Sequence, residues 1–299
     1  MEDILDSLRK IIFKWVNTVT PLTDDASTGD NQLRVQNTYR FRVGDEVMIK
    51  DPLIYETGLV VGSIIDSTTI QLTSNILNKW TVDQNATLIK TTNEQFVQGI
   101  YIGEPDVIPR YPAITVNGTS RASEWMTLES SKERYEVEIS IFVKESTHEQ
   151  GYRFLLKMAK IIQLGLKRNI IPLVNDYGLI SLYSDIATND VDIRLNNRSD
   201  LGDYRRIIIE NEYDMQENWI DKVYTEDDVS VRLMNPMCGN YSTSNTSIII
   251  PYRFVFNSWP SEIEYGKIHK GELMKAAVIR WFGEEEESQY RRREETYLS

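Results

Sequence analysis

The chain has 299 residues, which is enough for one large domain or two domains of ordinary size. Hydrophobic residues make up 41% and charged residues 26%, and this balance excludes a disordered or fibrous chain. The 33 basic and 45 acidic residues give a net charge of −12, so we expect no direct recognition of nucleic acid. Cys238 is the single cysteine, and His148 and His269 are the two histidines, so neither an internal disulfide nor a histidine-based metal centre is expected.

No stretch approaches the roughly 18 consecutive apolar residues that a membrane helix needs. The N-terminus carries Glu2, Asp3 and Asp6 where a signal peptide requires basic residues. We therefore expect a soluble protein that stays in a reducing compartment and has no membrane partner.

The first part of the chain predicts one helix followed by a β-rich module. Residues 3–16 carry apolar side chains at helical spacing, and the polar, turn-forming residues 20–32 end that helix. Short β-branched runs then follow to about residue 92, separated by Gly, Asp, Pro and Asn. Their spacing is typical of a small SH3-like β-barrel, which we assign to an inserted module at 18–95.

The pattern from Phe96 onward is mixed. Residues 134–144 alternate apolar and polar side chains as a half-buried strand does, and residues 149–168 predict a second amphipathic helix. A further strand is expected at 204–213. Residues 216–299 are interpreted as a C-terminal extension, with a short helix over GELMKAAVIRWF and a mobile charged tail over 284–295. We detect no internal repeat with the period of a solenoid or propeller.

No motif in the chain predicts catalysis. A phosphate-binding loop and a nucleophile elbow are absent from the sequence, and His148 is interpreted as an exposed residue near a helix start. Cys238 lies at a predicted turn without a neighbouring cation that would activate its thiol. The paired acids Glu136/Glu138 and Glu210/Glu212 are interpreted as solvated strand residues rather than glycosidase carboxylates. We therefore expect neither enzymatic activity nor a cofactor or metal.

The order of elements in one part of the chain resembles a known family. A helix is followed by PRYPAITV, by SEWMTLESSKERYEVEISIFV, by the helix EQGYRFLLKMAKIIQLGLKRN and, after a linker, by LGDYRRIIIENEYD. This order is similar to the tail terminator (tail-completion) proteins of long-tailed bacteriophages. The resemblance implies an α+β fold in which two helices pack on a mostly antiparallel sheet. It assigns the family core to 1–17 and 96–215, so that 18–95 is an insertion and 216–299 an extension.

The resemblance also implies a function. A terminator is a structural virion protein that forms a homo-oligomeric, hexameric ring on the tail tube and joins the tail to the neck and head. The expected partners are the tail tube protein, neck or connector proteins and, in a contractile tail, the sheath protein. Assembly would take place in the host cytoplasm. Another neck, connector or baseplate protein and, with less support, a soluble enzyme without a recognisable motif remain as alternatives.

Five residues are predicted to make contacts between subunits or with the tube. Arg121 and Trp125 lie in a loop-like stretch and belong to residue types that dominate interface hot spots. Phe142 interrupts the polar face of the strand at 134–144. The basic pair Arg205 and Arg206 is flanked by acidic residues, which favours ion pairs between protein surfaces.

Overall fold

The computed structural model describes residues 1–91, 97, 99–105, 107–125, 130–144, 148–168, 171–172, 177–201, 206–225, 227, 229–251, 254–255, 257–266 and 274–288. The chain forms two compact units. The core unit comprises Met1–Val16, Val97–Asp176 and Arg253–Ser299, and the two-module unit comprises Asn17–Phe96 and Tyr177–Tyr252. The predicted division was different. It assigned residues 177–215 to the core and residues 253–299 to a C-terminal extension, whereas the structure places the former in the two-module unit and the latter in the core unit.

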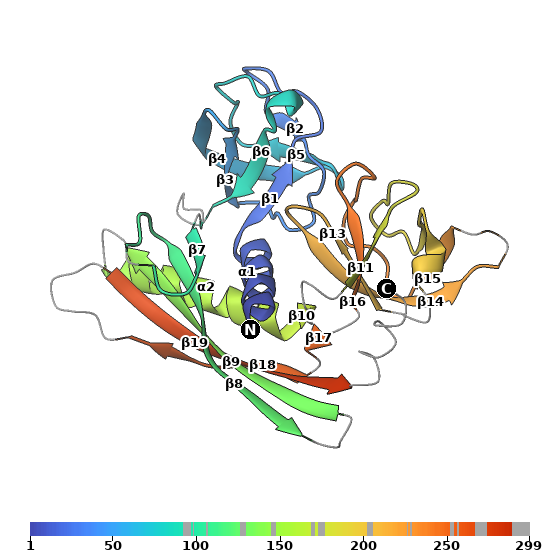
Figure 1. Cartoon of the computed structure of the whole chain (residues 1–299). Coiled ribbons are helices and arrows are strands. Elements are labelled where there is room, and N and C mark those ends of the chain that lie inside the picture. The colour runs from blue at the N-terminus through green and yellow to red at the C-terminus, as the bar shows by residue number, and fades with distance from the viewer. Residues whose placement is uncertain are drawn as a thin grey trace. The chain divides into compact units, whose positions relative to one another are not determined.

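The core unit consists of two helices on one face of a five-stranded sheet (Figure 1). The strand order is β18-β19-β9-β8-β7; β7 and β8 run parallel and the other neighbours antiparallel. A two-stranded ladder of β10 and β17 completes the unit. Its elements are α1 (Glu2–Val16), β7 (Gly99–Ile102), β8 (Ala113–Trp125), β9 (Ser130–Lys144), α2 (His148–Arg168), β10 (Ile171–Pro172), β17 (Phe254–Val255), β18 (Asn257–Tyr265) and β19 (Met274–Ser288).

Both amphipathic helices that the sequence predicts are present in the core unit. Helix α1 packs against β7, β8 and β10, whereas α2 packs against β9, β18 and β19. The two helices approach closely at Gly165, where an added Cβ would lie 2.6 Å from Cγ of Trp15. A glycine is required there because any side chain would push the helices apart. The residues that the two helices bury are Ile4, Leu5, Leu8, Ile11 and Ile12 of α1 and Phe154, Leu155, Met158, Ala159, Ile162 and Leu166 of α2.

Strand β19 corrects the prediction for the C-terminal part of the chain. The segment expected to form a short helix and the start of a charged tail is a 15-residue strand that lies between β9 and β18. It supplies Ala277, Ile279 and Trp281 to the core, each of which is 0% exposed. The rest of the predicted tail, 289–295, lies outside the described residues.

The two-module unit contains two copies of one β-fold, here called module A (18–90) and module B (177–251). Each copy is a six-stranded sheet, ordered β1-β6-β3-β4-β5-β2 in module A and β11-β16-β13-β14-β15-β12 in module B. In both, the first strand pairs with the last and the second strand lies at the far edge. The elements of module A are β1 (Thr18–Pro21), β2 (Gln32–Arg34), β3 (Glu46–Lys50), β4 (Tyr55–Ile64), β5 (Thr69–Leu72), η1 (Val82–Gln84) and β6 (Thr87–Lys90), and those of module B are β11 (Tyr177–Ser181), β12 (Asp192–Arg194), η2 (Arg198–Leu201), β13 (Arg206–Glu210), β14 (Met215–Val223), β15 (Ser230–Leu233) and β16 (Ser247–Pro251).

The turns of the two modules are also equivalent. Asp30 Oδ2 accepts the main-chain N–H of Ser27, and Asp190 Oδ2 accepts that of Ala187, both at 2.7 Å. The residue before each aspartate has a positive φ, 95° at Gly29 and 74° at Asn189. Sequence identity at equivalent positions accompanies this geometry. The identical pairs include Leu22/Leu182, Asp25/Asp185, Thr28/Thr188, Asp30/Asp190, Arg34/Arg194, Asn37/Asn197, Ile49/Ile209, Asp66/Asp227, Leu72/Leu233 and Ile89/Ile249.

Each module has its own apolar core. Trp80 is at the centre of module A and Tyr241 at the equivalent position of module B, and both are fully buried. Single bridges, Leu22 to Val35 and Leu182 to Leu195, connect the segment after the first strand with the segment after the second. Each sheet therefore curls back toward its own first strand.

Strand β13 corrects a second prediction. The strand expected to complete the core sheet instead pairs with β14 and β16 of module B. Ile207, Ile208 and Ile209 of this strand are all buried, so they leave no apolar face for a neighbouring subunit. The coarse fold class is nevertheless as predicted: an α+β protein with a mostly antiparallel sheet and two packed helices.

Each module is inserted into the core unit by two chain crossings that lie next to each other. In module A, the first and last residues, Thr18 and Lys90, are paired across β1 and β6. Module B does the same with Tyr177 opposite Pro251, and Pro172 and Phe254 pair on the core side of that insertion. The inserted region of the sequence is therefore not one module but two, separated by most of the core.

Candidate functional site

Three of the five predicted contact residues lie on the core sheet. Arg121 is on β8 and is half-exposed. Trp125 ends the same strand, opposite Ser131 of β9. Phe142 is half-buried on β9, between Ala113 of β8 and Ala276 of β19. The predicted loop is therefore the second half of a long strand.

Arg121 belongs to a network of charged residues at the hairpin end of this sheet. Its Nε lies 3.0 Å from Oε2 of Glu133, a buried carboxylate on β9, and its guanidinium lies 5.9 Å from the ring centroid of Tyr135. The Tyr135 hydroxyl donates to Glu285 of β19 at 3.1 Å, and burial, together with this carboxylate, raises the pKa of Tyr135. Lys132 and Arg134 of β9 pair with Glu284 at 2.8 and 3.1 Å. Arg121 thus balances a buried acid inside the sheet, in addition to any role at the surface.

The basic pair predicted at 205–206 has a different setting. Arg206 is buried in module B, where its Nε donates to Glu217 Oε1 at 2.7 Å. Its guanidinium lies 5.1 Å from the ring centroid of Trp219. Arg205 lies outside the described residues. The contacts of Arg206 with Glu217 and Trp219 therefore hold β13 to β14 within module B.

A second feature of the core sheet escaped the sequence analysis. Trp259 on β18 is 44% exposed and stacks on Phe282 of β19, with ring centroids 5.8 Å apart. Strand β18 is one edge of the described sheet, so Trp259 and Phe282 form an aromatic surface on a sheet face next to an edge that presents strand hydrogen-bonding groups.

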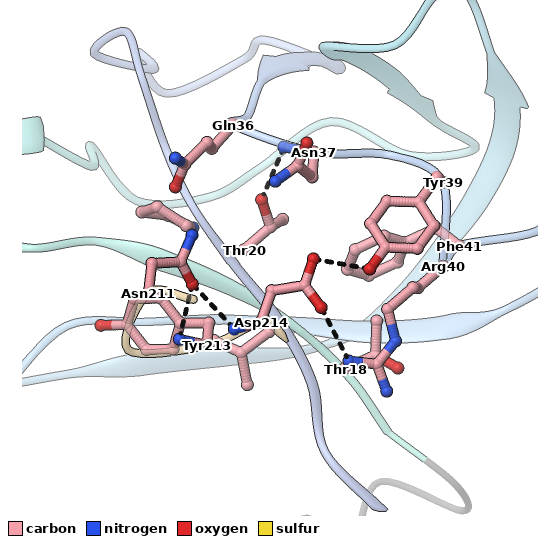
Figure 2. A pocket seen from close by; sticks show the side chains of 12 residues that line it. Thr18, Thr20, Gln36, Asn37, Tyr39, Arg40, Phe41, Asn211, Tyr213 and Asp214 are labelled. Atoms are coloured by element: carbon pink, nitrogen blue, oxygen red, sulfur yellow. Dashed lines mark hydrogen bonds and ion pairs between the residues drawn. The ribbon is translucent and has the colours of Figure 1, made fainter. Parts of the chain in front are cut away.

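The two modules meet in a polar contact, here called the module joint (Figure 2). Asn37 of module A binds the main chain of Asn240 in module B: its Nδ2 donates to the carbonyl at 2.9 Å, and its Oδ1 accepts the main-chain N–H. Asn240 Nδ2 in turn donates to the carbonyl of Gln36 at 2.9 Å. Figure 2 shows Tyr39 and Arg40 of module A pointing at Asp214 of module B. The hollow at this joint is lined by Thr18, Val19, Thr20, Pro21, Gln36, Asn37, Tyr39, Arg40, Phe41, Asn211, Tyr213 and Asp214.

Asp214 is the centre of the joint. Its carboxylate accepts the Tyr39 hydroxyl at 2.5 Å and the Tyr241 hydroxyl at 3.3 Å, and it lies 3.9 Å from Nη1 of Arg40. Burial and the Asp214 carboxylate both raise the pKa of Tyr39 and that of Tyr241. Burial and the neighbouring Glu212 raise the pKa of Tyr213 to about 12. These phenols remain neutral donors at physiological pH, which suits a structural contact rather than proton abstraction.

Replacing Asp214 tests the joint. Asp214→Ala leaves the buried Tyr241 hydroxyl and the Tyr39 hydroxyl without this acceptor, so we expect it to lower the free energy of unfolding of the two-module unit by about 1–3 kcal/mol. Asp214→Asn keeps one oxygen acceptor and should lose less than half as much. Urea unfolding followed by tyrosine and tryptophan fluorescence measures both. Equal stability of the alanine and asparagine variants would contradict the assigned role.

Among the described residues, no group of three or more His, Cys, Asp or Glu side chains could hold a metal ion. Cys238 is exposed, and no helix in the described part of the chain is long and apolar enough to cross a membrane.

No known protein family model matches the chain, and no curated protein matches its sequence.

Proposed function

We propose that this chain is a structural virion protein that closes the tail tube of a long-tailed bacteriophage as a homo-oligomeric ring and joins the tail to the neck. One observation carries the proposal: the core unit has two amphipathic helices on one face of a mostly antiparallel sheet, in the order helix, three strands (β7, β8 and β9), helix. This is the arrangement that the resemblance to tail terminators implies. The final strands are supplied by β18 and β19 in place of the segment at 204–213.

Two surfaces support assembly through protein contacts. The edge strand β18 carries the exposed Trp259, and aromatic side chains at a sheet edge are suited to packing against a neighbouring subunit. The hairpin end of β8 and β9 presents Arg121 and Arg134 beside buried acids. In the proposed ring, the tube protein, the neck proteins and, in a contractile tail, the sheath protein are the partners.

The two modules extend this proposal. We infer that each is an SH3-like β-barrel, because the bridges Leu22–Val35 and Leu182–Leu195 tie the ends of each sheet together. A pair of such modules adds binding surface to a ring subunit. The same pair favours, as the second candidate, another neck or connector protein that contacts more neighbours than a minimal terminator does.

The experiment is assembly on tail tubes. Purified full-length chain is analysed by size-exclusion chromatography and negative-stain imaging, alone and after incubation with purified tubes. We expect closed rings, free or seated on one tube end, and tubes that no longer elongate. A chain that remains monomeric and leaves tube ends unoccupied would contradict the proposal, and rings that bind only neck proteins would favour the second candidate.

A further inference from the structure

The module joint connects unlike faces of two copies of the same fold. Module A contributes β1 and the segment 36–41, here called its tail face. Module B contributes two turns, 211–214 and 237–240, here called its head face. Such a contact is heterologous, so each module keeps one face that the joint does not use. The unused faces are the head face of module A and the tail face of module B.

The first turn in the head face of module A has the same hydrogen bonds as the first turn in the head face of module B, which the module joint occupies. In module A, Asp51 Oδ1 accepts the N–H groups of Leu53 and Ile54 at 2.7 Å each. In module B, Asn211 Oδ1 accepts those of Tyr213 and Asp214 at 2.9 and 2.7 Å.

The second turn of each head face is anchored in the same way. Glu56 Oε1 accepts the N–H of Leu77 at 2.7 Å, and Gln216 Oε1 accepts that of Cys238 at 2.8 Å. Both turns of the unused head face are therefore fixed in the geometry that binds a tail face in module B.

The side chains on this unused head face are apolar. Leu53 is 82% exposed, Leu77 is 75%, Tyr55 is 68% and Ile54 is 45%. Leu53, Ile54 and Leu77 on the two turns, with Tyr55 at the start of β4, form the kind of exposed apolar patch that marks a protein–protein contact. At the equivalent positions, the occupied head face of module B has Tyr213, Asp214, Met215 and Cys238.

The unused tail face of module B offers a matching surface. Leu179 takes the position of Val19, which lines the occupied joint, and it is 58% exposed. Asn197 takes the position of Asn37 and is also exposed. In the module joint, the side-chain amide of Asn37 binds the main chain of the head face of module B. That interaction does not depend on which side chains the head face carries.

We propose that the head face of module A docks on the tail face of module B in a second copy of this chain, through Leu53, Ile54 and Leu77 against Leu179 and Asn197. The module joint inside one subunit would then be repeated between subunits, as a head-to-tail series. A heterologous contact of this kind closes into a ring when its rotation allows. This inference deepens the proposed function by naming the subunit interface, and it rests on that function.

Cross-linking of single-cysteine variants tests the interface. In a Cys238→Ser chain, which has no other cysteine, Leu53→Cys and Leu179→Cys are made separately and treated with a short bismaleimide under assembly conditions. A head-to-tail contact predicts covalent dimers only when the two variants are mixed. Val43→Cys, at a site of module A that is 66% exposed and outside the head face, is the matched control in place of Leu53→Cys and should give no dimer with Leu179→Cys.

A second variant keeps the test informative about function. Leu53→Asp with Leu77→Asp puts charges on solvent-exposed turns, so we expect an unchanged monomer fold by circular dichroism and at least a tenfold loss of assembly. Assembly of this variant as in the wild type, no dimer in the mixture, or dimers from Leu53→Cys alone would each overturn the interface. If rings still cap tubes in those cases, the proposed function stands. If the wild-type chain neither assembles nor binds tubes, the function fails together with the interface.

Discussion

Removing β19 is expected to unfold the core unit. A chain that ends after Gly266 lacks the strand between β9 and β18, and with it the buried Ala277, Ile279 and Trp281. Loss of a buried tryptophan side chain alone costs about 3–5 kcal/mol, whereas a whole domain is stable by about 5–15 kcal/mol. Losing the strand also exposes the apolar side of β9 and its hydrogen-bonding groups. We expect an aggregating chain that is cleaved rapidly by protease, as measured by limited proteolysis and circular dichroism.

The matched control ends after Ser288. This chain keeps every described strand and should retain the circular dichroism spectrum and melting temperature of the full chain. The sequence interpretation makes the opposite prediction for the shorter chain, because it treats 216–299 as an extension outside the core. A chain ending after Gly266 with a native-like melting transition in its core would contradict the role of β19.

The helix expected in this segment shows where sequence patterns reach their limit. Residues 274–288 contain two Ala and four Glu, which favour helices, and the apolar residues are dense enough to satisfy either period. The alternation of Ala277, Ile279 and Trp281 is also a strand pattern. Tertiary pairing with β9 decides between them, and no local signal reports it. By contrast, α1, α2 and β9 were predictable because each has one strong and unambiguous period.

The duplication was hidden for a physical reason. Two β-modules of the same fold need only share alternating apolar positions and the polar residues that cap their turns. Here those are residues such as Asp30 and Asp190, which look ordinary in isolation. The two copies together make up about half of the chain, and more than half of the core unit separates them. The joint was equally unpredictable, because Asn37 and Asp214 are typical turn residues until the fold brings them to a shared contact.

Excising both modules is expected to leave a folded core unit. The cut sites are set by pairing: Thr18 opposite Lys90 for module A, and Tyr177 opposite Pro251 for module B. A short Gly/Ser linker can replace each excised segment because its ends are adjacent in a strand pair. The apolar cores of the modules contain no residue of the core unit, so its buried side chains remain. Each halving of a loop changes its closure entropy by only about 0.6 kcal/mol, so shortening the loops should not unfold it.

Hydrogen exchange and calorimetry of the excised chain measure the outcome. We expect one cooperative transition, protected amides in β8, β9 and β19, and a soluble protein that has lost the head-to-tail cross-link. The matched control removes 18–64 alone, which leaves β5 and β6 without their partner strands and exposes Ile70, Leu72 and Leu88, so this chain should aggregate. An excised core without protected amides, beside a full chain that is folded, would show that the modules stabilise the core and are not independent insertions.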